Sequence, residues 1–191
     1  METTARYSLE QLPVWVKISV TLLFSHFLIG CGAGSLPRGA VYVENRETSI
    51  VVLGVRPQMR VQAVNGTRGS HGWNQGMSST TTINAVPEDG YVVAEVAPTK
   101  NGEAYAITTI FPGFLDIWRV CTGNAVVTIQ VPPKSIVYVG DITIIEEGKY
   151  RIELNGNFAR ATEFMSRNFP SMAPRLTELR AIMGVMEDGA C

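Results

Sequence analysis

The sequence predicts a mainly β protein: an antiparallel β-sandwich followed by two short C-terminal helices. The first observation is compositional, since residues 31–191 contain 18 Val and 12 Ile but only 6 Leu. β-branched side chains favour strands, whereas Leu favours helices. The second is that short apolar runs follow one another closely, separated by Asn, Glu, Gly and Pro. The third is a change of period after residue 156, where apolar residues recur at helical spacing.

Each expected strand is a short run rich in β-branched or aromatic residues and bounded by turn residues. The runs are 40–44, 49–55, 59–64, 80–85, 91–97, 104–111, 114–120, 125–131, 136–145 and 150–154. Turns are expected at 87–90 and 100–102. The last two strands form a hairpin in which Tyr150, Ile152 and Leu154 share one face. Most aromatic residues fall inside these runs, so packing in the core is their expected role.

Two helices are expected at the end of the chain. Asn157 can cap the first, which places Ala161, Phe164 and Met165 on one side. Ser171 can cap the second, with Pro174 in its first turn. The apolar stripe of the second helix consists of Leu176, Leu179, Ile182, Met183 and Met186. The predicted organisation is therefore a sandwich at 39–156, with helices at 157–191 packed on the same domain.

Composition and charge exclude several classes of protein. Apolar residues make up 46% of the chain, which is too high for a disordered protein. The net charge of -1 provides no basic surface for nucleic acid, so no nucleic-acid partner is expected. Three cysteines in 191 residues are too few for a disulfide scaffold. The length fits one domain with a short appendage.

The first thirty residues do not fit the pattern of the rest of the chain. Arg6 and Lys17 lie ahead of an apolar run at 18–29, which is 12 residues long. A membrane-spanning helix needs about 20 apolar residues, so this run has the length of a signal-peptide core. It ends in Leu28-Ile29-Gly30-Cys31.

This ending resembles the lipobox of bacterial lipoproteins, in which a small residue precedes the cysteine that is lipidated. The resemblance implies that residues 1–30 are a signal peptide, cleaved between Gly30 and Cys31. It also implies that Cys31 carries the lipid that attaches the protein to a membrane. The alternative is a buried helix that happens to end in a cysteine.

In that family an Asp after the lipidated cysteine favours retention on the inner membrane, and Gly32 stands at this position. The resemblance therefore implies the cell envelope, with the outer membrane facing the periplasm as the favoured location. Residues 31–38, which include Gly32, Gly34, Ser35 and Pro37, are expected to form the lipidated cysteine and a flexible tether.

The body carries a second resemblance, based on Phe111-Pro112-Gly113, the runs at 126–131 and 134–142, and Asn168-Phe169-Pro170. These features resemble small bacterial lipoproteins with carboxypeptidase-regulatory-like β-sandwiches, and they imply an immunoglobulin-like sandwich. That group carries no assigned catalytic residues, so the resemblance assigns no site to this chain.

Cys121 and Cys191 remain after the lipidated cysteine is set aside, and an even number in an oxidising compartment can pair. Such a disulfide would close a loop of about 70 residues and add on the order of 3–4 kcal/mol to stability. The alternative is a buried Cys121 and a frayed Cys191.

The stretch 65–79 has the least strand character and is the candidate ligand loop, with Arg68, Ser70, His71 and Trp73 as candidate binding residues. Ser70 beside His71 suggests a nucleophile and its base, but adjacent side chains rarely form that hydrogen bond. The alternatives are an exposed loop without function, a binding loop and a catalytic loop.

No pattern of metal ligands or of a cofactor motif is present in the sequence, so none is expected. Asp141 follows Gly140 inside an expected strand, and it is either a functional carboxylate or, by preference, a turn or bulge residue.

The function expected from these features is that of a lipid-anchored envelope protein that binds or holds a ligand without catalysis. Its expected partners are the membrane, through Cys31, and another envelope protein or peptidoglycan. The alternative is an envelope hydrolase that uses Ser70 and His71.

Overall fold

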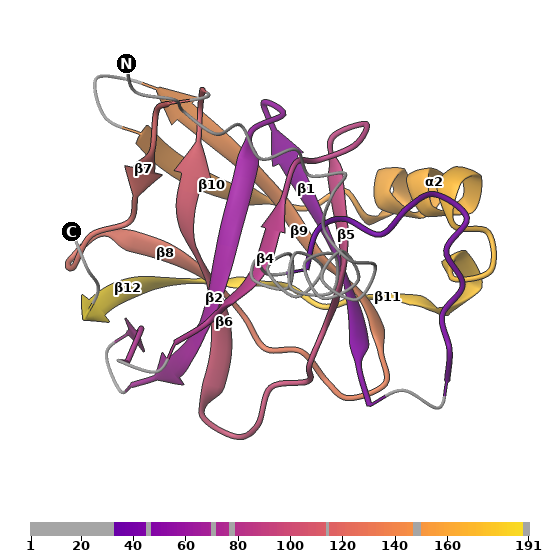
Figure 1. Ribbon diagram of the computed structural model, residues 1–191, viewed down its shortest axis with the longest axis horizontal. Helices are drawn as coiled ribbons and strands as arrows, with labels where there is room; N and C mark the ends of the chain where they lie inside the picture. The colour runs from indigo at the N-terminus through magenta and orange to yellow at the C-terminus, as the bar shows by residue number, and fades with distance from the viewer. Residues whose placement is uncertain are drawn as a thin grey trace, which may run out of the picture. The chain divides into compact units, whose positions relative to one another are not determined.

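The computed structural model shows a mainly β, sandwich-like fold (Figure 1). It describes residues 33–44, 47–69, 72–76, 79–113, 115–146 and 150–188. Within these residues, twelve strands form a five-stranded sheet and a seven-stranded sheet, and one α-helix follows the tenth strand. The predicted class and the predicted sandwich architecture are therefore confirmed, while the immunoglobulin-like type stays a prediction.

Both sheets combine strands from distant parts of the chain. The five-stranded sheet contains β1 (Ser49–Arg56), β5 (Tyr91–Val96), β9 (Ile136–Glu146), β10 (Tyr150–Asn155) and β11 (Leu176–Glu178). The seven-stranded sheet contains β2 (Arg60–Arg68), β3 (Trp73–Asn74), β4 (Thr81–Ala85), β6 (Glu103–Phe111), β7 (Trp118–Arg119), β8 (Ala125–Ile129) and β12 (Ile182–Asp188).

The pairing is mixed, so the predicted antiparallel sandwich is only partly correct. β9 pairs in parallel with β1 on one edge and with β11 on the other, and β12 pairs in parallel with β3. The remaining pairs are antiparallel, including the expected β9–β10 hairpin. Parallel neighbours need long connections, and these strands lie far apart in the sequence.

The core between the two sheets follows from the alternation of side chains along each strand. Val51, Leu53 and Val55 of β1 point toward the seven-stranded sheet, where they join residues of β2, β6 and β8. Ile50 and Val52 point the other way, into a second apolar cluster. Both faces of the five-stranded sheet are therefore buried, which explains why its strands are nearly continuous apolar runs.

The outer face of this sheet is covered by α2 (Phe158–Asn168), as Figure 1 shows. Ala161, Phe164 and Met165 of the helix pack on the sheet, and the Phe164 ring stacks on Tyr91 at 4.5 Å between centroids. Asn157 caps the helix, because its side-chain oxygen accepts a hydrogen bond from the Arg160 N–H at 3.0 Å. The first predicted helix, its cap and its buried face are confirmed.

A β-bulge in β9 changes which residues face the helix. Val52 pairs with Tyr138, but the next residue, Leu53, pairs with Gly140, so Val139 is the extra residue. Gly140 has a φ of +116°, a backbone conformation that favours glycine. The bulge places Asp141 on the helix side and Ile142 in the core between the sheets. The interpretation of Gly140-Asp141 as a bulge is confirmed.

In the seven-stranded sheet, strand pairings close a ring. β2 pairs with β3, β3 with β12, β12 with β8, β8 with β6, and β6 with β2. The Trp73 side chain, with 0% exposure, joins Val64, Val126 and Met186 in the cluster inside this ring. Ala104 and Ala106 are in the same cluster, and their small side chains leave room for the indole.

The second predicted C-terminal helix is wrong. Residues 173–175 form a short 3-10 turn, and the chain continues as β11 and β12. The expected stripe splits between different environments: Leu176 packs below α2, whereas Met186 lies inside the strand ring. A short apolar pattern cannot distinguish helix from strand, and here pairing with β9 and β8 decides the outcome.

The other differences are local. Residues 40–44 are not a strand. Of the described residues 115–120, which belong to the expected strand 114–120, only Trp118–Arg119 form one (β7). The strand β3 was not predicted. The segment expected as a flexible tether packs against the domain from residue 33 onward, since Ala33 bridges Ile83 and the Leu36 N–H donates to the Val93 carbonyl. Among the described residues, no helix is long and apolar enough to cross a membrane.

Candidate functional site

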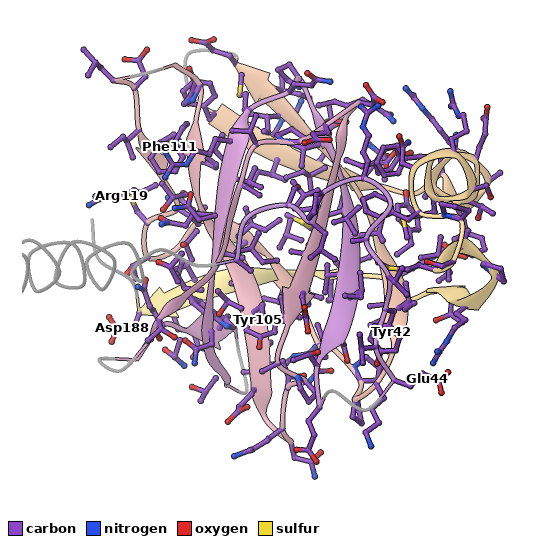
Figure 2. All side chains as sticks on the ribbon, turned by 45° about the vertical axis from the view of Figure 1, so that its right-hand side comes forward. Tyr42, Glu44, Tyr105, Phe111, Arg119 and Asp188 are labelled. Carbon is purple, nitrogen blue, oxygen red and sulfur yellow. The ribbon has the colours of Figure 1, made fainter. Side chains whose placement is uncertain are left out.

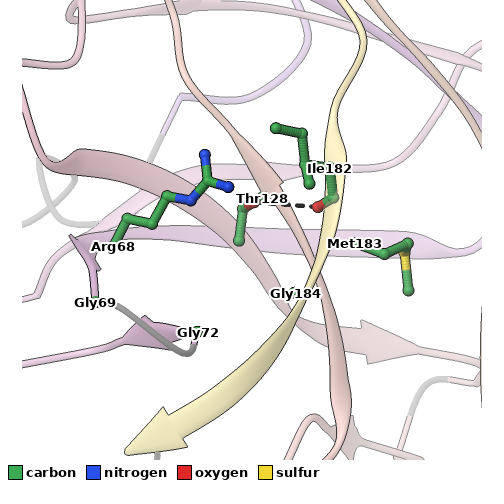
Figure 3. Close-up of a pocket in the computed structure, with 7 residues that line it drawn as sticks. All are labelled: Arg68, Gly69, Gly72, Thr128, Ile182, Met183 and Gly184. Atoms are coloured by element: carbon green, nitrogen blue, oxygen red, sulfur yellow. Dashed lines mark hydrogen bonds between the residues drawn. The ribbon is translucent and has the colours of Figure 1, made fainter.

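The candidate site is a shallow cavity between the end of β2, the start of β3 and the strand β12. Its volume is about 150 Å³. Figure 3 shows the Arg68 side chain extending toward Thr128 and Ile182. The remaining lining residues are Gly69, Gly72, Met183 and Gly184. The cavity therefore joins the loop predicted to bind a ligand to a strand from the far end of the chain.

Two glycines allow the loop to lie directly against β12. A Cβ at Gly72 would stand 2.1 Å from the Val185 carbonyl oxygen, and one at Gly69 would stand 2.6 Å from Oε2 of Glu187. The approach is held by Asn74, whose side-chain N–H donates to Glu187 at 2.6 Å. A larger residue at position 72 would push the loop away from the strand, since its closest contact is backbone.

Three apolar side chains of β12 are exposed: Ile182 is 45%, Met183 39% and Val185 44% exposed. Because side chains alternate along a strand, Ile182 lies on the side of Arg68, whereas Met183 and Val185 lie on the opposite face (Figure 3). Arg68 is exposed as well, and its guanidinium forms no ion pair with any of the described residues. We call these four side chains the β12 surface. It combines apolar area with one unpaired positive charge, which suits a partner that carries apolar groups next to a carboxylate.

The strand that carries this surface is held rigidly. Residues 182–185 pair with 128–125 of β8, and Thr128 Oγ1 donates to the Ile182 carbonyl at 3.1 Å. The carboxyl end of β12 pairs with Trp73 and Asn74 of β3. The backbone that carries the exposed side chains is therefore fixed before any partner arrives.

The residues predicted for the binding loop lie in different environments in the structure. Arg68 lines the cavity. Trp73 lies inside the strand ring and its Nε1–H donates to the Ala104 carbonyl at 3.1 Å, so its ring packs the core and does not face a ligand. Ser70 and His71 lie outside the described residues. The residues of β12 were missed, because their apolar pattern predicted a buried helical stripe.

A second polar group of residues lies under α2, where Asp141 is 3% exposed. Its carboxylate faces Arg56 at 3.3 Å and accepts a hydrogen bond from the Tyr138 hydroxyl at 2.7 Å. The same hydroxyl accepts a hydrogen bond from the Asn157 N–H at 2.8 Å. Gly54 makes room, since a Cβ there would collide with Oδ1 of Asp141.

The electrostatics of this group are those of a structural network. Burial is the largest cause of the raised pKa of the Tyr138 phenol, and the Asp141 carboxylate raises it further, against the opposing effect of the Asn157 N–H. Burial and Asp141 likewise raise the pKa of Tyr91. Both phenols therefore stay protonated, and Tyr138 links β9 to the start of α2.

Cys121 lies in the turn between β7 and β8, and its sulfur is disulfide-bonded. The partner sulfur belongs to a residue outside the described ranges, so its pairing with Cys191 stays a prediction. The path of the chain favours that pairing, because the last turn before β8 lies beside the end of β12. Gly123 donates to the Met186 carbonyl at 2.7 Å, and Met186 donates to that of Asn124 at 2.9 Å. Gly30 and Cys31 also lie outside the described residues.

Comparison with protein-family models, with curated proteins and with solved structures finds no match to this chain. The two resemblances stated for the leader and the body therefore stay predictions.

We predict that Tyr138→Phe lowers the free energy of unfolding by roughly 1–3 kcal/mol, because the buried Asp141 carboxylate and the Asn157 N–H each lose a partner. It should also flatten the pH dependence at high pH. A raised phenol pKa stabilises the folded state below about pH 10, the pKa of an unfolded Tyr, and this contribution is lost as the pH rises further.

Urea unfolding between pH 8 and pH 11 measures both effects. Val52→Ala is the matched control, since it removes apolar contact on the same face and changes no titrating group. It should lower stability equally at every pH. If the free energy of unfolding of the Tyr138→Phe protein changed with pH as it does in the wild type, Tyr138 would not have the proposed role in the network.

We predict that Cys121→Ser and Cys191→Ser have the same effect. Each should leave one reactive thiol, change the mobility in non-reducing gels and lower the free energy of unfolding by about 3–4 kcal/mol, the value for a loop of about 70 residues. Cys31→Ala is the control and should leave the disulfide intact. A Cys191→Ser protein whose Cys121 thiol stays unreactive would show that Cys191 is not the partner.

Proposed function

We propose that this protein is a non-enzymatic binding module of the cell envelope, attached by a lipid at Cys31 and holding a partner protein on the β12 surface. One observation carries the binding role: a paired strand exposes three apolar side chains, of which Ile182 lies on the side of Arg68 and Met183 and Val185 on the opposite face. Exposed apolar groups that lie together and are bordered by polar ones mark interaction sites.

The composition of the surface supports a protein partner. Met and Arg are enriched in protein interfaces, and the core of an interface is depleted of most other charges. A partner side chain that enters the cavity would meet Thr128 and Gly184 at its wall. A carboxylate on the partner would pair with Arg68 without displacing an existing ion pair.

Rigidity supports binding in a further way. Ordering side chains and loops at an interface costs free energy on association, and this cost is smaller where the surface is already fixed. β12 is paired with β8 along residues 182–185 and with β3 beyond them. The partner therefore meets a preformed surface.

The location is supported by the sequence of the leader. The 12-residue apolar run ends in Gly30-Cys31, which is the arrangement expected for a lipidated cysteine. Gly32 then favours the outer membrane, with the domain facing the periplasm. A lipid-anchored module would hold its partner close to the membrane.

The lipid anchor predicts that Cys31→Ala abolishes labelling by a radioactive or clickable fatty acid and moves the protein from the membrane to the soluble fraction. Cys121→Ser is the matched control and should keep both the label and the membrane association. Undiminished labelling of the Cys31→Ala protein would disprove lipidation at this position.

The binding role predicts that Met183→Glu combined with Val185→Glu lowers the yield of a partner captured by cross-linking in cells by about tenfold or more. That loss corresponds to about 1.4 kcal/mol, which one hot-spot residue can supply. Val41→Glu is the matched control, because Val41 is an exposed apolar residue outside the β12 surface.

Mass spectrometry should identify the same protein from the wild type and from the Val41→Glu variant. Co-sedimentation with purified peptidoglycan tests whether the β12 surface binds a polysaccharide instead of a protein. If the wild type binds peptidoglycan and the variant with Met183→Glu and Val185→Glu does not, the partner is a polysaccharide and the proposed protein partner is wrong. Equal capture by all variants would disprove a role for β12.

A further inference from the structure

The folded domain begins almost directly at the predicted anchor. The Ala33 N–H donates to the Thr82 carbonyl at 2.8 Å, and its carbonyl accepts from the Asn84 N–H at 3.1 Å. Only Gly32 separates this residue from Cys31. Two residues span at most about 7 Å, so a lipid at Cys31 would hold the β4 edge within that distance of the bilayer interface.

A continuous path of contacts leads from this point to the loop between β6 and β7. Asn84 accepts a hydrogen bond on its side-chain oxygen from Arg60 Nε at 2.7 Å. The Arg60 guanidinium lies over the Phe111 ring, 4.5 Å from the centroid. Phe111 is the last residue of β6, and the loop 112–117 starts immediately after it. The loop is therefore three side-chain or backbone contacts away from Ala33.

This end of the domain exposes large apolar side chains from two connecting segments. Leu115 is 84% and Ile117 54% exposed in the loop after β6, and Val86 is 59% exposed just after β4. Connecting segments normally expose polar side chains to water. Aliphatic groups as open as these are suited to contact with the acyl region beneath the lipid headgroups.

The residues around the loop match the chemistry of a bilayer interface. Trp118 packs against Tyr150 with 5.8 Å between ring centroids, and such amphipathic rings favour the headgroup level. Arg60 and Arg119 supply positive charge, and Figure 2 shows Phe111 and Arg119 on the same flank. Asp116 and Glu146 are opposing charges: Glu146 accepts a hydrogen bond from Tyr150, and the Asp116 carboxylate turns back toward Gly113, where an added Cβ would stand 2.8 Å from Oδ2.

We propose that Leu115 and Ile117 of the loop after β6, together with Val86, rest on the bilayer to which Cys31 is anchored and fix the orientation of the domain on the membrane. This inference rests on the proposed lipid anchor, because the anchor brings the β4 edge to the membrane. The loop adds a second contact, which limits rotation of the domain about a single point. The β12 surface is then left for the partner.

The test places a tryptophan at one of two exposed positions in full-length protein that also carries Trp15→Phe and Trp118→Phe. Leu115→Trp reports on the loop and Met183→Trp is the matched control on β12. The remaining tryptophan of the domain, Trp73, is fully buried. Each protein is reconstituted into phosphatidylcholine–phosphatidylglycerol vesicles, with or without bromine on the acyl chains, which quenches tryptophan on contact.

The expected result is an emission loss of about twofold or more for Leu115→Trp and of less than about a tenth for Met183→Trp, since an interfacial group lies roughly 5–10 Å into the headgroup region. Labelling with a fatty acid is measured on the same samples. Acylated protein on vesicles with no quenching at position 115, or with equal quenching at both positions, would overturn the loop contact and leave the anchor standing.

The opposite combination is equally informative. Protein that carries no acyl label but still binds vesicles and is quenched at position 115 would refute the anchor and keep the loop contact. Protein that neither carries the label nor binds vesicles would overturn both proposals.

Discussion

The buried carboxylate of Asp141 is the constraint on which much of the fold depends. A charge at this depth is costly unless it is paired, and removing one member of such a pair costs roughly 3–5 kcal/mol. Arg56 at the end of β1, Tyr138 in β9 and, through the phenol, Asn157 at the start of α2 all have to be in place. The bulge at Gly140 makes this possible, because it turns Asp141 toward the helix and returns Ile142 to the core. One polar residue thus couples the sheet to its covering helix.

The last strand completes the second half of the molecule in a comparable way. β12 closes the ring of strands around Trp73, and Met186 supplies part of the packing inside it. The same strand presents Ile182, Met183 and Val185 to solvent and ends beside the turn that contains Cys121. Core closure and the candidate surface therefore both depend on a strand from the far end of the chain, which ends beside the disulfide-bonded Cys121.

The sequence patterns that succeeded were local, and those that failed depended on distant partners. Val and Ile runs predicted β1, β5 and β9, because β-branched residues favour strands wherever they lie. Asn157 predicted its helix, because capping needs only the next few residues. The stripe from Leu176 to Met186 satisfied helical spacing, yet pairing with β8 and β9 made it two strands. For the same reason Arg68 could be predicted as a candidate, whereas its neighbours Ile182 and Met183 could not.

The two exposed apolar surfaces differ in the way expected of different partners. The β12 surface lies on a strand that pairs with β8 along residues 182–185 and with β3 beyond them, so the spacing of its backbone is fixed, as shape complementarity with a protein requires. Leu115 and Ile117 lie in a connecting loop with Arg119 nearby, and no strand fixes their spacing. A bilayer imposes no fixed pattern of contacts, and binding to it strengthens with buried apolar area and positive charge. The difference in rigidity between the two segments supports the proposal that the strand binds a folded partner and the loop contacts the membrane.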